Sequence, residues 1–67
     1  MIKIRCVVER ITYQNPENGY SVLKCAVKNY NDLVTVVGNL VDVNVGSVLL
    51  IDGNWKVDAK YGRQFLA

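Results

Sequence analysis

The chain of 67 residues carries a formal net charge of +2, from eight Lys and Arg against six Asp and Glu, and it has no histidine. A chain of this length forms one small domain, and its charge lies below the basic excess that is typical of nucleic-acid-binding domains. Without histidine, Cys6 and Cys25 are too few ligands for a zinc site, so we expect both to be buried free thiols.

The N-terminal segment, residues 2–13, alternates apolar with charged residues and predicts a long β-strand. The apolar residues stand at even positions as far as Val8 and at odd positions, Ile11 and Tyr13, after it. This change of parity predicts a bulge between Val8 and Arg10. The charges in the segment exclude a signal peptide, and no stretch of about 20 apolar residues follows. We therefore expect a soluble, cytoplasmic protein with no membrane partner.

The next six residues, Gln-Asn-Pro-Glu-Asn-Gly, predict the loop of a β-hairpin. Asn15 suits the first position of a type I turn, and Pro16 presets the φ angle of the second. Asn18 and Gly19 both tolerate a positive φ, which allows the chain to turn back into a second strand. Val, Ile, Thr and Tyr on both sides of the loop favour strands.

The second predicted strand covers residues 20–28 and has two distinct faces. One face carries Leu23, Cys25 and Val27, and the other carries Tyr20, Lys24 and Lys28. After the polar turn at residues 29–32, the continuous apolar run from Leu33 to Gly38 predicts a third strand that is buried on both faces or is a short strand of a barrel.

A short connector at residues 39–47 leaves room for no more than a vestigial helix before the fourth predicted strand, residues 48–57. In that strand Trp55 and Val57 have the inward parity of the core, and Lys56 has the outward parity. Residues 58–60 turn again, and a fifth strand covers residues 61–66. Five short strands with an interior glycine such as Gly53 predict an all-β fold, a small closed or nearly closed barrel. The OB fold is the leading candidate and an SH3-like barrel the alternative.

Four blocks of the sequence resemble the extreme N-terminal domain of RecD-like ATP-dependent DNA helicases of the RecD/TraA type. The blocks are Val8–Tyr13, Asn15–Leu23, Val36–Leu40 and Lys60–Phe65. They keep their order along essentially the whole chain. One departure lies in the connector, where relatives commonly carry prolines and this chain has Val41 and Val45.

The resemblance implies that residues 1–67 are a single OB-like accessory domain, the N-terminal fragment of a larger helicase that acts in DNA repair and recombination. In such helicases a helix-hairpin-helix region and a superfamily 1 motor follow, and the motor binds ATP and Mg²⁺. Relatives continue beyond the position of Ala67, which implies that the fifth strand is cut short. No glycine of this chain precedes Lys-Ser or Lys-Thr, so the fragment has no phosphate-binding loop. We therefore expect no enzyme activity and no cofactor in this fragment.

OB folds generally bind through the face of their second and third strands, with aromatic stacking and basic contacts to phosphates. On this basis the candidate DNA-binding residues are Tyr20, Lys24, Lys28, Tyr30, Tyr61 and Arg63, and we expect Tyr61 and Arg63 to project outward from the fifth strand. Each has a structural alternative. Tyr20 is also suited to pack against Tyr13 or Ile11, and Lys24 and Lys28 to serve as solubilising charges. Arg63 is equally suited to an ion pair with Glu9 and to a partner contact.

Two classes of function remain. The first is an accessory domain that contacts single-stranded DNA and guides it relative to the motor domains of the same chain. The second is a protein-interaction or intramolecular docking module with no nucleic-acid contact. The fold and the resemblance favour the first class, whereas the small net charge favours the second. An unpaired strand edge would in addition allow two copies to associate.

Overall fold

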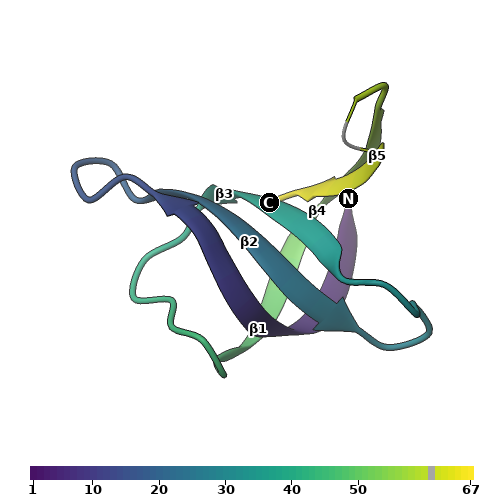
Figure 1. The fold of residues 1–67 in the computed structure, drawn as a ribbon, viewed down its shortest axis with the longest axis horizontal. Helices are drawn as coiled ribbons and strands as arrows, with labels where there is room; N and C mark the ends of the chain where they lie inside the picture. Colours follow the sequence, from purple (N-terminus) through teal and green to yellow (C-terminus); the bar gives the residue numbers. More distant parts are fainter. Residues whose placement is uncertain (61) are drawn as a thin grey trace.

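The computed structural model describes residues 1–60 and 62–67, which form five β-strands and no helix. The strands are β1 (Ile2–Gln14), β2 (Tyr20–Val27), β3 (Val34–Asn39), β4 (Val48–Asp58) and β5 (Gly62–Leu66). They pair in the order β1-β2-β3-β5-β4, and β4 pairs with β1, so the sheet closes into a barrel (Figure 1). All neighbours are antiparallel except β3 and β5, which are parallel. The predicted all-β, five-stranded OB-like barrel is confirmed.

The long strand β1 belongs to both halves of the barrel. Its residues 2–7 pair with β4, and its residues 6–14 pair with β2. The register with β2 shifts between Val8 and Arg10, as the change of parity predicts, and shifts again between Ile11 and Tyr13. Each irregularity bends the strand and increases its twist, and this bending allows one strand to follow the curve of the barrel.

The loop between β1 and β2 forms the predicted hairpin. The N–H of Asn15 donates to the carbonyl of Tyr20 (2.8 Å), and the N–H of Gly19 donates to the carbonyl of Asn15 (2.9 Å). Gly19 takes the positive φ, at 77°. Asn18 instead uses its side chain, whose Oδ1 accepts a hydrogen bond from the N–H of Tyr20 (2.9 Å). The loop is therefore held by local hydrogen bonds of the kind its residue types favour.

The side chains that face the inside of the barrel form one hydrophobic core. Its buried members are Cys6, Val8, Leu23, Cys25, Val27, Val34, Val36, Val43, Ile51 and Phe65. Gly53 makes room for this core, because a Cβ at that position would collide with the carbonyl oxygen of Leu66 and the ring of Phe65. Both cysteines are buried free thiols, as expected. Burial raises the pKa of the Cys6 thiol, and it raises that of Cys25 to about 12.

The ends of the strands depart from the predicted parity. Val57 has the inward parity but is 77% exposed, because the end of β4 runs past the barrel and pairs there with β5 (Figure 1). Trp55, two residues earlier on the same face of β4, is partly buried against the core. At the start of β1, Ile2 also shares the parity of the core, yet it is 47% exposed.

Closure of the barrel also bears on self-association. Each strand has hydrogen-bonded neighbours on both sides over part of its length. The described residues therefore leave no strand unpaired along a whole side, although the second half of β1 and the end of β4 each pair on one side only. Self-association through such an edge stays a prediction. The connector at residues 40–47 forms no helix and packs Val43 into the core.

Candidate functional site

The outer face of β2 and β3 is built by the alternation of side chains along two paired strands. Because Ser21, Leu23 and Cys25 are fully buried, their neighbours on β2 point outward. The register pairs Lys24 with Thr35, and Val22 with Val37. Side chains that are separated in the sequence are therefore adjacent on the outside of the barrel.

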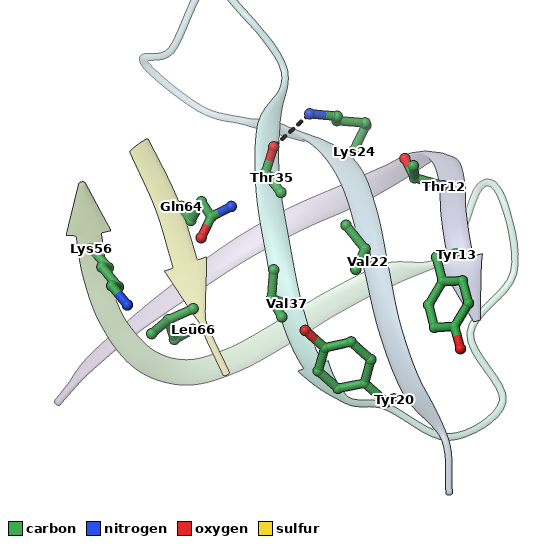
Figure 2. A pocket seen from close by; sticks show the side chains of 10 residues that line it. All are labelled: Thr12, Tyr13, Tyr20, Val22, Lys24, Thr35, Val37, Lys56, Gln64 and Leu66. Atoms are coloured by element: carbon green, nitrogen blue, oxygen red, sulfur yellow. Dashed lines mark hydrogen bonds between the residues drawn. The ribbon is translucent and has the colours of Figure 1, made fainter. Parts of the chain in front are cut away.

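The parallel strand β5 extends this face. Its register with β3 pairs Thr35 with Gln64 and Val37 with Leu66. The result is a groove of about 550 Å³ across the three strands (Figure 2). We call it the outer groove; its lining residues are Thr12, Tyr13, Tyr20, Val22, Lys24, Thr35, Val37, Lys56, Gln64 and Leu66.

The outer groove has an apolar floor with aromatic and cationic groups around it. Val22, Val37 and Leu66 form the floor. Tyr13 and Tyr20 lie at one end, with ring centroids 6.3 Å apart and planes tilted by 59° (Figure 2). They are 51% and 39% exposed, so Tyr20 packs against Tyr13, as its structural alternative predicts, and still presents ring surface to solvent.

The cations of the outer groove are Lys24 and Lys56, on β2 and β4 (Figure 2). The Nζ of Lys24 donates a hydrogen bond to the Oγ1 of Thr35 at 2.6 Å, across the two strands. Thr35 carries no charge, so this bond positions the ammonium group without neutralising it. The arrangement leaves a positive charge near the middle of β2, four residues from Tyr20.

A second hollow, of about 670 Å³, adjoins the outer groove and shares Lys24 and Thr35 with it. We call it the side hollow; it is lined by Lys24, Asn29, Tyr30, Asn31, Asp32, Leu33, Val34, Thr35 and Arg63. Behind it the Tyr30 ring packs on Trp55, with centroids 5.4 Å apart. The guanidinium carbon of Arg63 lies 5.6 Å from the Tyr30 centroid and 5.7 Å from the Trp55 centroid, within cation–π range.

Arg63 is exposed, as predicted, although its position on β5 does not have the outward parity. On β5, Gln64 and Leu66 face the outer groove, and Arg63 has the opposite parity, that of the fully buried Phe65. It remains exposed because it lies on the part of β5 that runs past the barrel, where the rings of Tyr30 and Trp55 are its nearest partners. No ion pair between Arg63 and Glu9 is found in residues 1–60 and 62–67.

The structure thus brings four of the six predicted residues to two adjoining hollows. Tyr20 and Lys24 line the outer groove, and Lys24, Tyr30 and Arg63 line the side hollow. Lys28 is exposed and lines neither, and Tyr61 lies outside the described residues. The sequence analysis did not predict the apolar floor of the groove or the position of Gln64. The outward parity of the apolar Val22 indicated that part of this face is apolar.

A family model described as the OB-fold domain of the ATP-dependent DNA helicase YrrC matches residues 1–67. The match agrees with the five-stranded closed barrel and excludes the SH3-like alternative. Comparison with curated proteins and with solved structures gave no match.

Proposed function

We propose that this chain, which belongs to the family of OB-fold domains of YrrC ATP-dependent DNA helicases, is a non-catalytic accessory domain that contacts single-stranded DNA through its outer groove. The observation that carries the proposal is the combination, in one groove, of exposed tyrosines, an apolar floor and lysines, of which Lys24 is held by a neutral hydroxyl group. The RecD/TraA affiliation and the place of the domain at the N-terminus of a cytoplasmic helicase, whose motor domains bind ATP and Mg²⁺, are parts of the same proposal.

The chemistry of the groove suits a strand without a partner. Unpaired bases expose flat π faces, and stacking of a base on an aromatic side chain contributes about 1–3 kcal/mol without regard to sequence. Tyr20 and Tyr13 offer such rings, and the apolar floor accepts sugars and base faces. The ammonium groups of Lys24 and Lys56 are suited to backbone phosphates, which carry most of the affinity in such complexes.

The test is fluorescence anisotropy of a labelled oligothymidylate titrated with the chain at low salt. We expect weak binding, because the two lysines of one small site supply about two phosphate contacts. With a slope of about −0.7 for each contact, a threefold rise in salt lowers the affinity about fivefold. Tyr20→Ala removes a stacking partner and should lower the affinity by about one order of magnitude or more.

A matched control is available on the other side of the barrel. Leu50 is 68% exposed and lies on β4, opposite Arg5 of β1. Leu50→Ala removes an exposed apolar side chain of similar size and should leave DNA binding unchanged. Equal losses for both variants would show that the outer groove is not the binding site.

The docking module remains as the second candidate, and the apolar floor formed by Val22, Val37 and Leu66 is the observation that favours it. Such a floor also accepts side chains of another protein segment, including the motor domains of the same chain. If the oligonucleotide does not bind at low salt, the DNA-binding proposal is wrong and the docking module takes its place.

A further inference from the structure

We infer that the side hollow is a second nucleotide subsite of the same DNA strand, in which a base stacks on Tyr30 and its phosphate lies between Lys24 and Arg63. This inference rests on the proposed function. It adds a site on the turn between β2 and β3 and at the start of β5, away from the floor of the outer groove. Three features of the structure support it.

The first feature is continuity. Lys24 and Thr35 line both the outer groove and the side hollow. Tyr20 and Lys24 are four residues apart on β2, a distance of about 13 Å along a strand. A DNA strand that lies along β2 from Tyr20 therefore reaches the side hollow as soon as it passes Lys24, and the one ammonium group serves phosphates on both sides.

The second feature is rigidity. Phe65 is fully buried, and Trp55 packs edge-on against it, with centroids 5.1 Å apart and planes at 76°. Tyr30 packs on Trp55, and 38% of its surface remains exposed. The stacking surface is thus fixed to the core before any ligand arrives. A preorganised surface loses less side-chain entropy on binding than a mobile one.

The third feature is charge. Arg63 holds its guanidinium group over two aromatic rings, and no acid is paired with it among the described residues. A planar guanidinium group in this position offers donors to phosphate oxygens while it keeps its stacking contact. The turn residues Asn29, Asn31 and Asp32 line the same hollow. The two amides supply further hydrogen-bonding groups, whereas the Asp32 carboxylate disfavours a phosphate on its side of the hollow, so the phosphate is expected nearer to Arg63 and Lys24.

Trp55 provides an intrinsic fluorescence signal for occupancy of the side hollow. Trp55 is the single tryptophan of the chain, and it contacts both Tyr30 and Arg63. A nucleotide in the side hollow changes the surroundings of Tyr30 and Arg63 and should therefore change the fluorescence of Trp55. A strand that occupies the Tyr20 end of the outer groove alone should not.

The experiment follows Trp55 fluorescence during titration with unlabelled oligothymidylate, in parallel with the anisotropy of a labelled one. We expect the two curves to give the same dissociation constant. Arg63→Gln should weaken binding about threefold to tenfold and suppress the Trp55 response, whereas Arg5→Gln, a matched change on the outer face of β1, should alter neither. Arg63→Lys keeps the charge but loses the planar stack, so it should recover part of the affinity.

The outcomes separate the two proposals. If anisotropy shows binding that depends on Tyr20, while Trp55 fluorescence stays constant and Arg63→Gln binds like the unmodified chain, the second subsite is wrong and the proposed function stands. If no binding occurs at all, the proposed function is wrong and this inference falls with it. Circular dichroism checks that each variant keeps the barrel. Should Arg63→Gln lose it, Arg63→Lys carries the test, because a response to DNA equal to that of the unmodified chain would overturn the inference.

Discussion

Two outer faces of the same barrel, built by the same alternation of residues, have different chemistry. The face of β2, β3 and β5 carries the outer groove with its tyrosines and cations. The face of β4 and the first half of β1 pairs Arg5 with Leu50 and Val7 with Val48, and it has no aromatic side chain. Its apolar residues are exposed, Leu50 by 68% and Val48 by 53%, instead of forming a floor.

The groups that position the lysines also differ between the two faces. On the β1–β4 face the Nζ of Lys3 lies 3.9 Å from the Oδ1 of Asp52, and both side chains are more than half exposed. Such a pair contributes little to stability, and its acid repels phosphate. Lys24 is held instead by the neutral hydroxyl of Thr35. A lysine held by a neutral group keeps its positive charge available for a phosphate, whereas a lysine paired with an acid does not. The net charge of the chain does not distinguish these two cases.

The largest effect that separates the two faces should come from Phe65→Ala. Phe65 is fully buried and its register with Val36 holds β5 against β3. Removing a buried ring costs about 3–5 kcal/mol, a large fraction of the stability of a small domain. Urea unfolding followed by circular dichroism measures this loss. Leu50→Ala on the other face should change stability by less than about 0.5 kcal/mol, and a similar cost for both would contradict the described burial.

A second effect is the pH dependence of stability, which depends on a thiol in the core beneath both faces. Burial, with smaller contributions from the Cys6 thiol and Glu9, raises the pKa of Cys25 from 9.0 to about 12. Above about pH 9 the unfolded chain loses this proton and the folded chain keeps it, so stability falls between about pH 9 and 12. By about pH 10.5 the loss should reach about 2 kcal/mol. Urea midpoints measured across this range should fall less steeply for Cys25→Ala.

The same burial predicts slow chemistry at the thiols. Cys6 and Cys25 are 1% and 0% exposed, and their raised pKa values keep them protonated at neutral pH. A thiol reagent should therefore modify the native chain slowly and the urea-unfolded chain at once. Rapid labelling of either cysteine without denaturant would show that the interior opens to solvent.

The smallest effect should appear in the salt dependence of DNA binding. Lys24→Gln removes one phosphate contact, so the slope of log affinity against log salt should become less steep by about 0.7. Arg5→Gln removes the same charge from the β1–β4 face and should leave the slope unchanged. Lys28→Gln should have an intermediate effect at most, because Lys28 lines neither hollow. Equal slopes for the Lys24 and Arg5 variants would mean that DNA does not discriminate between the faces.

Local features of the fold were predictable from the residues that form them. The hairpin depends on turn chemistry at Asn15 and Gly19, and the bulge on a change of parity after Val8. The parallel pairing of β3 with β5 was not predictable, because no local pattern specifies which distant strand closes a barrel. For that reason Tyr20 and Lys24, which line the outer groove, could be predicted as candidate residues, whereas Gln64 could not. The exposure of Arg63 and the error at Val57 have the same cause. The parity of a residue predicts the face of the strand on which it lies, but the barrel covers that face along only part of the strand.

The parallel pairing also has a consequence for the order in which the molecule assembles. The strands β1, β2 and β3 follow one another through short turns, whereas Val36 meets Phe65 across the connector and all of β4. Contacts between residues so distant in sequence form late and slowly, because the chain loses loop entropy before it gains them. We therefore expect β5 to be placed last during synthesis and refolding. With it form the side of the outer groove that β5 contributes and the side of the side hollow that carries Arg63. A nascent chain with only its first three strands in place would present neither hollow to DNA, so competence to bind should arise in the same step that closes the ring.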